Sequence, residues 1–399
     1  MNGHQQYQHQ QQHHNRQQHH HHHHQQQQQR LLEQHQRLLE QQQRCLPQQC
    51  SRRPSAAASA TAAVVSSNPA AAVLRPAQPP PSSPSKHRPR IVHLDDELAL
   101  SAALTADGYR LGSTVGHGSY SKVRIAYRTV PVTATKSSTA RVACKVINKR
   151  RDSGTSSYVR KFLPRELDVL RTVRHPNVVR THRIYVTPNT VHVFMDYCEI
   201  GDLLSHLQHV KSIPQWQAHT FFRAHDFFHD RARHAHRRQI CEAVDYLHQK
   251  NISHRDIKCE NVLLESMRTV KLTDFGFARL CADERGRRLM SQTYCGSSSY
   301  AAPEVLQGIP YDPISYDMWA LGVVLYVMLS DAMPFPHSNR QQIVANQIAK
   351  KFSRPKKPVS REALKLISII LEPDVNKRAT MNQVKHHPWV KQQNPYHTH

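Results

Sequence analysis

The chain has 399 residues, with 54 Lys and Arg, 29 Asp and Glu, and a formal net charge of +25. Most of this charge follows residue 105, but the sequence has neither a basic helix interleaved with aromatic residues nor an RNA-binding signature, which argues against nucleic acid as a partner. The eight Cys include no C-x-x-C pair and the N-terminus has no apolar signal segment, so we expect reduced thiols and a cytoplasmic location, with the nucleus as the alternative.

Residues 1–105 have the composition of a tail. Gln and His tracts come first, and a run rich in Ala, Pro and Ser follows over 51–92. Because so few large apolar residues cannot offset the entropy lost on ordering, we predict that 1–105 are disordered. A Leu-Leu-Glu repeat within 31–40 covers only two heptads, which favours a transient helix over a coiled coil. About 290 residues remain, enough for one two-lobed domain over 106–390, with 391–399 as a short tail.

The first hydrophobic patterns after the predicted tail are those of strands. Val123, Ile125 and Tyr127 alternate with charged residues, which is typical of a strand with one buried face. Similar reasoning predicts strands at 141–147, 178–186 and 190–197 and a helix at 161–173.

Helical spacing dominates after Gly201. The longest apolar run, at 319–329, is too short to span a bilayer, which favours a buried core helix and argues against a membrane partner. Strands followed by helices predict a small β-rich lobe at about 106–197 and a larger helical lobe at about 198–390.

A glycine-rich stretch, VGHGSYSKV, occupies residues 115–123. It has Gly116 and Gly118, but Ser121 stands where a third glycine is usual. A dinucleotide-binding loop leads into a helix, whereas this loop leads into a strand, which excludes that class. A glycine loop between two antiparallel strands instead places its backbone N–H groups over phosphates.

Several downstream motifs accompany this loop at the spacing of a known set. Lys145 lies on a predicted strand and Glu166, its expected partner, on the following helix; HRDIKCEN at 254–261, DFG at 274–276 and APE at 302–304 come later. Each motif alone is a weak signal, but all of them in this order resemble the protein kinases. The resemblance implies an α+β, two-lobed protein-kinase fold and ATP-dependent phosphoryl transfer.

The kinase resemblance assigns roles to the polar residues of these motifs. Phosphoryl transfer requires in-line positioning and neutralised charge. Asp256 would accept or orient the proton of the substrate hydroxyl, and Lys258 would reach the transferred group. Asn261 and Asp274 would supply oxygen ligands to Mg²⁺. The predicted nucleotide-binding residues are Val115, Gly116, Gly118, Val123, Ala143, Lys145, Asp196, Cys198, Asp202 and Leu263.

Longer segments narrow the resemblance to one family. GSYSKV at 118–123, FLPREL at 162–167 and APEVLQGIPYD at 302–312 are similar to the testis-specific serine/threonine-protein kinases, within the calmodulin-kinase-like group. The similarity covers about 106–390. It implies ATP- and Mg²⁺-dependent phosphorylation of Ser and Thr in proteins and a role in spermatid development; we expect a monomer.

The resemblance also implies a regulatory pair and two structural contacts. Arg255 precedes Asp256 in the catalytic loop, and Thr293 occupies the matching place on the activation segment. Phosphorylation of Thr293, by an upstream kinase or by the chain itself, would order that segment through bonds to Arg255. Two further contacts are implied, Glu304 with Arg378 and Asp317 with the catalytic-loop backbone.

One departure from the family pattern leaves alternatives open. Residues 224–238 interrupt a helix that in such kinases runs without a break. If the insert displaces the helical core, the chain is a pseudoenzyme or scaffold with weak transfer. A second alternative is an interaction protein that works through its Gln- and His-rich tail.

Acidic residues indicate which peptides would bind. Asp196, Glu199, Asp202 and Glu260 would place negative charge beside the peptide groove of an otherwise basic domain. This arrangement favours substrates with Arg or Lys a few residues before the target Ser.

Overall fold

The computed structural model describes residues 88–118, 121–131, 137–150, 158–210, 213–222, 239–336 and 338–391. All of them belong to the second of two compact units, Ser85–His399. The predicted disorder of residues 1–87, the heptads at 31–40, the insert at 224–238 and nearly all of the short tail at 391–399 lie outside the described residues.

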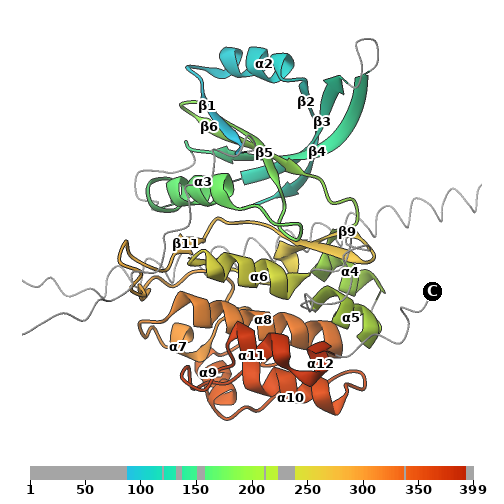
Figure 1. The fold of residues 1–399 in the computed structure, drawn as a ribbon, viewed down its shortest axis with the longest axis vertical. Helices are drawn as coiled ribbons and strands as arrows, with labels where there is room; N and C mark the ends of the chain where they lie inside the picture. The colour runs from blue at the N-terminus through green and yellow to red at the C-terminus, as the bar shows by residue number, and fades with distance from the viewer. Residues whose placement is uncertain are drawn as a thin grey trace, which may run out of the picture. The chain divides into compact units, whose positions relative to one another are not determined.

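The first lobe is built on one six-stranded sheet in the order β1-β5-β6-β4-β3-β2 (Figure 1). β1 pairs with β5 in parallel, and the other neighbours are antiparallel. The strands are β1 (Arg90–His93), β2 (Tyr109–His117), β3 (Ser121–Pro131), β4 (Ser137–Asn148), β5 (Thr181–Val186) and β6 (Thr190–Asp196). These confirm the strands predicted from alternation and add two.

The lobe begins before residue 106, so the predicted boundary of the tail is wrong. β1 and the helix α2 (Glu97–Ala106) both lie within the segment assigned to the tail. Asp96 caps α2 by accepting a hydrogen bond from the Ala99 N–H at 2.7 Å. Leu100 and Leu104 are buried against the sheet. These few apolar residues are enough to order α2 because the apolar face of the sheet supplies the other side of the contact.

A single helix of the first lobe lies on the side of the sheet nearer the helical lobe (Figure 1). A short π-helical turn, Tyr158–Phe162, leads into α3 (Leu163–Thr172). Pro164 lies in the first turn of α3, where its missing N–H is harmless. Leu163, Glu166 and Leu170 are buried at helical spacing, so α3 presents a carboxylate on its buried face.

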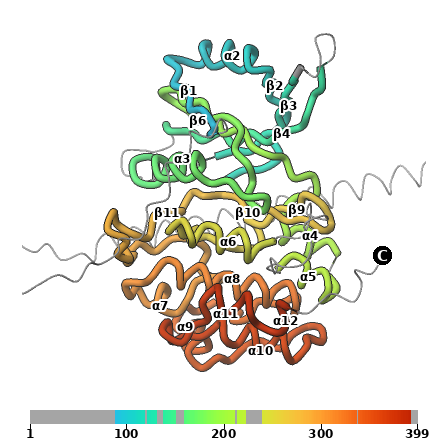
Figure 2. Tube along the Cα trace, in the orientation of Figure 1, coloured from blue at the N-terminus to red at the C-terminus, as the bar shows by residue number. Residues whose placement is uncertain are grey.

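The second lobe is mainly helical, as predicted. Its helices are α4 (Leu203–Val210), α5 (Gln215–Phe222), α6 (Ile240–Gln249), α7 (Pro303–Leu306), α8 (Pro313–Ser330), α9 (Arg340–Ile348), α10 (Arg361–Ile370), α11 (Met381–His386) and α12 (Pro388–Lys391). Short strands β7 (Gly201–Asp202), β8 (Ile252–Ser253), β9 (Val262–Ser266), β10 (Thr269–Leu272) and β11 (Arg279–Leu280) form two small sheets. The segment carrying β9, β10 and β11 runs between the first lobe and the helices (Figure 2).

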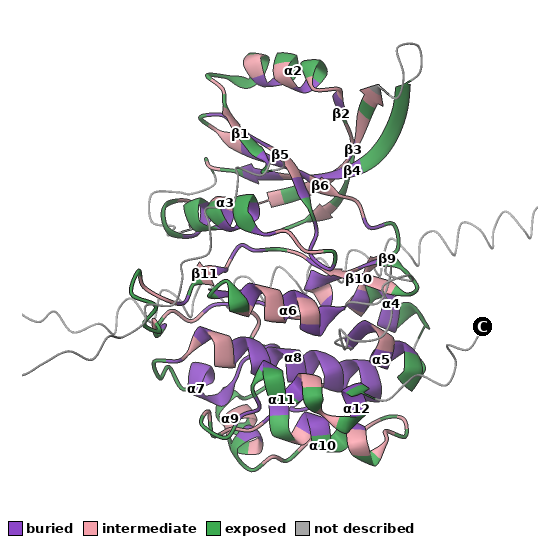
Figure 3. Cartoon of the chain, in the orientation of Figure 1, coloured by how far each residue is buried: buried purple, intermediate pink, exposed green. Residues whose placement is uncertain are grey.

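Helix α8 forms the centre of the second lobe and is buried along nearly its whole length (Figure 3). It is the one helix among the described residues long and apolar enough to cross a membrane, but 89% of that stretch is buried inside the protein. The prediction of a buried core helix at 319–329 is therefore confirmed. Gly322 allows a close approach, since a Cβ there would lie 2.6 Å from Ile370 Cγ2 on α10.

The buried side chains form two clusters. The larger one runs from one face of the sheet through α3 into the helical lobe, and it includes Phe221, Phe222 and Ile240 on both sides of the insert. The smaller one lies between α2 and the sheet around Tyr185 and Phe194. Leu170, Val193 and Phe275, which line the site described next, belong to the larger cluster.

Candidate active site

A cavity of about 580 Å³ lies where β2, β3 and β4 face the segment from β6 to β7 and the strand β9. Glycine, apolar and charged residues all contribute to its walls. Every predicted nucleotide-binding residue lines it: Val115, Gly116, Gly118, Val123, Ala143, Lys145, Asp196, Cys198, Asp202 and Leu263. Sequence reasoning therefore identified the outline of this cleft.

Sequence reasoning missed part of the apolar lining. Val193 and Met195 reach the cleft from β6, and Val179 and Phe275 also line it. Val193 and Met195 are two apart on one face of a strand, so the period-two pattern could have identified them. Val123 and Ala143, on neighbouring strands of the same sheet, continue this apolar wall, which suits a flat apolar group.

Ser121, which stands where a third glycine is usual, is hydrogen-bonded to the second glycine of the loop. The Gly118 N–H donates to the Ser121 carbonyl oxygen at 2.7 Å, and Gly116 pairs with Val123 across the hairpin. A Cβ on Gly118 would lie 3.0 Å from Ser121 Oγ. A side chain on Gly118 would therefore need the Ser121 hydroxyl to move.

Lys145 lies between two carboxylates inside the cleft. Its Nζ is 2.8 Å from Glu166 Oε1 on α3 and 2.8 Å from Asp274 Oδ1. Loss of hydration inside the cleft would raise the pKa of the Asp274 carboxyl, but the Lys145 ammonium lowers it to about 2. Asp274 has φ 63, a left-handed conformation that a non-glycine residue adopts at a cost. The cleft thus holds an ionised carboxylate beside a fixed cation.

Asp256, Lys258 and Asn261 form a second group close to Asp274. Lys258 Nζ lies 2.9 Å from Asp256 Oδ2, and Asn261 Nδ2 donates to the same oxygen at 3.0 Å. Burial would lower the pKa of Lys258, but the Asp256 carboxylate raises it above its usual value. Because the side-chain nitrogen of Asn261 donates to Asp256, its side-chain oxygen Oδ1 is left for a ligand in the cleft that Asn261 lines.

Two residues of the activation segment contact this group and were not predicted. Ser297 accepts from Lys258 Nζ at 3.0 Å through Oγ, and its N–H donates to Asp256 Oδ1 at 3.2 Å. Gly296 has φ +84, and a Cβ there would lie 2.5 Å from the Arg255 carbonyl oxygen. The run of small residues CGSSS after Thr293 was the available signal.

The catalytic-loop backbone is fixed by Asp317 on α8, as predicted. Its Oδ2 accepts from the His254 N–H and its Oδ1 from the Arg255 N–H, both at 2.8 Å. Burial would raise the pKa of Asp317, but its bond to His248 Nε2 at 3.0 Å lowers it. Asp317 therefore stays ionised and holds Arg255 in its left-handed conformation at φ 63.

The predicted contact between Glu304 and Arg378 is also present. Arg378 Nη1 lies 2.7 Å from Glu304 Oε1, and Nη2 lies 2.9 Å from Oε2. Both residues are buried. This bidentate pair links α7 to the segment before α11.

Arg255 is buried and only partly bonded. Its Nε donates to the Phe277 carbonyl at 2.7 Å and its Nη1 to Ser291 Oγ at 3.3 Å, whereas Nη2 is buried without a hydrogen-bond partner among the described residues. Thr293 is two residues beyond Ser291, and Lys161 Nζ lies 3.4 Å from its Oγ1. The Thr293 hydroxyl therefore already has one cation beside it.

Three of the four acidic residues expected beside the peptide groove are engaged within the chain. Asp196 binds His182 and Lys271, Glu199 binds Arg141, and Asp202 accepts from Ser205 at the start of α4. Glu260 differs: burial raises its pKa, and its Oε2 is buried with no partner among the residues described.

The side-chain oxygens of Asp274 and Asn261 suit Mg²⁺, which takes part of its ligands from phosphates and water, better than a metal ion that is coordinated by protein side chains alone. Within the described ranges, no cluster of three or more His, Cys, Asp and Glu could hold a metal ion. Mg²⁺ prefers oxygen ligands, and in phosphoryl-transfer sites it takes one or two carboxylates together with phosphates and water. The Asp274 carboxylate and the Asn261 carbonyl oxygen fit that requirement.

A two-lobed fold with Lys145, Glu166 and Asp274 joined in the cleft defines the class of protein: a protein kinase. The family model of the protein kinase domain matches residues 109–390. Testis-specific serine/threonine-protein kinase 2 of Mus musculus is 37% identical to this chain, over 74% of this chain's length and 76% of its own length.

Testis-specific serine/threonine-protein kinase 3 of Homo sapiens is 37% identical over 72% of this chain and 97% of its own. A plant relative, the SNF1-related protein kinase catalytic subunit alpha KIN12 of Arabidopsis thaliana, is 32% identical over 72% of this chain and 52% of its own. The chain belongs to the testis-specific serine/threonine-protein kinase family and is a serine/threonine protein kinase.

Proposed function

We propose that this kinase transfers the γ-phosphoryl group of Mg²⁺-bound ATP to Ser and Thr of proteins through the residues of the cleft. The observation that carries the proposal is the position of Lys145, 2.8 Å from both Glu166 and Asp274 inside a cavity of about 580 Å³. Bound Mg²⁺ would neutralise phosphate charge, with Asp274 and Asn261 as its protein ligands. Asp256, held by Asn261 and Ser297, is oriented to take the proton of the substrate hydroxyl.

The test is phosphate transfer from Mg·ATP to a generic Ser/Thr protein by the chain and by its Asp274→Ala variant. We expect transfer by the parent and none above background by the variant. Asp95→Ala, outside the cleft and before α2, is the matched control and should behave as the parent. Equal, background-level signals from the parent and the Asp274→Ala variant would overturn the proposal.

The pseudoenzyme or scaffold remains a second candidate because of the insert at 224–238. The residues flanking it, Phe222 and Ile240, are both buried in the main core, which favours a helical lobe that accommodates the insert and an active enzyme. Deleting 224–238 tests this. If the deleted chain transfers phosphate and the full chain does not, the scaffold interpretation is correct; similar rates would exclude it.

We propose that phosphorylation of Thr293 activates the kinase. The Arg255 Nη2 group without a partner and the Lys161 ammonium beside Thr293 support this, because a phosphate would bond to both cations. Each such bond is worth roughly 1.5–3 kcal/mol, so Thr293→Ala should lower transfer by about tenfold or more. Ser299→Ala, an exposed position on the same segment, is the matched control. Unchanged transfer by Thr293→Ala would refute the switch.

For substrates, we propose a preference for Arg or Lys a few residues before the target Ser, recognised chiefly by Glu260. Its buried, unpartnered carboxylate oxygen supports this, since Asp196, Glu199 and Asp202 are bound within the chain. Glu260→Gln should raise the KM of an Arg-containing peptide and leave that of its Ala counterpart unchanged. A peptide array without a basic preference would refute the proposal.

A role in spermatid development is proposed from the relatives, which are called testis-specific. The test is the tissue distribution of the transcript and the effect of its removal on sperm formation. Expression confined to tissues other than the testis would contradict it.

A further inference from the structure

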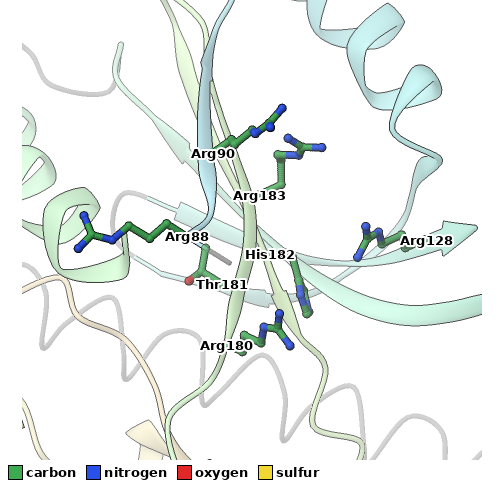
Figure 4. A pocket seen from close by; sticks show the side chains of 7 residues that line it. All are labelled: Arg88, Arg90, Arg128, Arg180, Thr181, His182 and Arg183. Atoms are coloured by element: carbon green, nitrogen blue, oxygen red, sulfur yellow. The ribbon is translucent and has the colours of Figure 1, made fainter. Parts of the chain in front are cut away.

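A second cavity, of about 320 Å³, lies on the first lobe beside β1 and β5 (Figure 4). Arginines dominate its lining, which consists of Arg88, Arg90, Arg128, Arg180 and Arg183 with Thr181 and His182. The cavity shares only Thr181 with the lining of the active-site cleft. Neither the transfer reaction nor its regulation at Thr293 uses these arginines.

The sheet itself brings the arginines together. Arg90 on β1 stands opposite Arg183 on β5 in the strand register, and neighbouring strands are only about 4.8 Å apart. Arg128 reaches the same space from β3, and Arg180 from the residue before β5. Figure 4 shows Arg90, Arg183, Arg128 and Arg180 around one open space, whereas Arg88 extends the other way. Like charges placed opposite one another repel unless an anion lies between them.

Carboxylates do not balance this charge. Asp107 accepts from Arg183 Nη2 at 2.9 Å, and Asp196 is bound to His182 and Lys271. Arg88, Arg90, Arg128 and Arg180 form no ion pair with any residue that the structure describes. Among the described residues the cavity therefore has more cationic side chains than acids, and three of the arginines without an ion pair, Arg90, Arg128 and Arg180, surround the open space.

Arg128 adds an independent observation. It is half-buried, with its guanidinium carbon 5.5 Å from the centre of the Tyr109 ring, and its Nε is buried with no hydrogen-bond partner in the described ranges. A buried donor without a partner is costly. An ordinary solvated basic face needs no cavity and leaves no such donor, whereas an anion would give the Arg128 guanidinium a partner.

We propose that this cavity is a binding site for a phosphate monoester. A phosphate group carries close to two negative charges and three oxygens, which can accept from several guanidinium groups at once. A carboxylate has one charge and two oxygens and leaves more of the arginines unpaired. The cavity volume suits a small ligand, either a phosphoserine side chain of a protein or a small phosphorylated molecule. Arg90 and Arg180, exposed and free of ion pairs in the described chain, are its outer ligands, and Arg128 and Arg183 its inner ones.

The experiment is calorimetric titration with two probes, phenyl phosphate and a five-residue phosphoserine peptide. The test variant is Arg90→Gln with Arg180→Gln, both exposed. Arg354→Gln with Arg361→Gln is the matched control, because it removes the same charge at two exposed positions of the helical lobe. We expect the Kd of the probes to rise at least tenfold in the test variant and less than about twofold in the control.

A comparison of the two probes identifies the source of the phosphate, and further ligands test whether the site binds phosphate at all. Tighter binding of the phosphoserine peptide supports a protein-borne phosphate, and equal binding supports a small phosphorylated molecule. The proposal is overturned if neither probe binds the parent chain, if both double variants weaken binding equally, or if a glutamate peptide binds as well as the phosphopeptide. Binding of a short RNA without binding of either probe would also overturn it and assign the cavity to nucleic acid.

Discussion

Two charged groups buried in the helical lobe, Arg378 and Asp317, are bonded more completely than Asp274 in the cleft. Arg378 binds both oxygens of Glu304 and also donates from Nε to the Glu372 carbonyl at 2.8 Å. Asp317 accepts from two backbone N–H groups with one oxygen each. None of these residues lines either of the two cavities described above.

In the cleft, the Asp274 carboxylate can still accept a further hydrogen bond or a metal ion. The Asp274 side chain is 44% exposed and is bound on one oxygen by Lys145. A charged side chain whose hydrogen bonds are all made within the protein fixes the backbone around it. A charged side chain that lies beside a cavity and is only partly bonded can exchange a protein partner for a ligand. This difference separates structural from functional charges, and it can be tested.

The largest effect is expected from Asp256→Asn. Asparagine keeps the size of the side chain but cannot take a proton, so the transfer rate should fall by about 10²–10⁴-fold. Asp256 is buried and bonded to Lys258 and Asn261, so the free energy of unfolding should also fall, by about 1–3 kcal/mol. Initial rates and urea denaturation measure the two effects. A loss of stability without a loss of transfer would show that Asp256 is a structural charge.

Arg378→Ala should have the reverse effects. It leaves the Glu304 carboxylate buried without its partner, which costs about 3–5 kcal/mol of unfolding free energy. Replacing both residues, Glu304→Gln with Arg378→Leu, removes the uncompensated charge and should cost less. Urea denaturation of the three chains measures this. If Arg378→Ala is as stable as the parent, complete bonding is not what stabilises the helical lobe.

Gly296→Ala tests the close approach of the activation segment to the backbone of the catalytic loop. Gly296 and Gly308 both have positive φ, but a Cβ on Gly308 would meet nothing within 4 Å. Gly308→Ala should therefore cost only the roughly 1–2 kcal/mol of the left-handed conformation. Gly296→Ala should cost about 1–3 kcal/mol more, because its Cβ displaces the Arg255 carbonyl, and it should also lower transfer. Equal losses of stability and activity in the two variants would contradict this reading.

The sequence could predict those parts of the site that local patterns define. Lys145 and Glu166 lie in motifs of fixed spacing, and alternation placed Lys145 on a strand. The run of small residues CGSSS could mark Ser297 as a candidate. Its contact with Asp256 could not be predicted, because the two residues are 41 apart and meet only through the path of the activation segment. The facing of Arg90 and Arg183 depends on the register of a parallel strand pair, and composition had assigned Arg90 to the tail.

His192 extends the comparison to a buried group that is not bonded to an opposite charge. It lies on β6 with only 5% of its surface exposed, and its Nδ1 is 3.4 Å from Thr190 Oγ1. Burial lowers its pKa to about 4, with Arg124 and Lys122 acting in the same direction and Glu97 against it. If buried charges require full bonding, His192 must stay neutral in the folded chain.

The sign of its pH effect follows from that pKa. Between about pH 6.5 and 4 the unfolded chain binds a proton at this histidine and the folded chain does not, so stability falls as the pH falls, by up to about 3 kcal/mol in total. His192→Gln should remove this part of the pH dependence of unfolding. His93→Gln, at an exposed position of β1, should leave it unchanged. If His192→Gln and the parent lose stability in parallel below pH 6.5, His192 is protonated in the fold, and a buried charge is tolerated there without a bonded counter-charge.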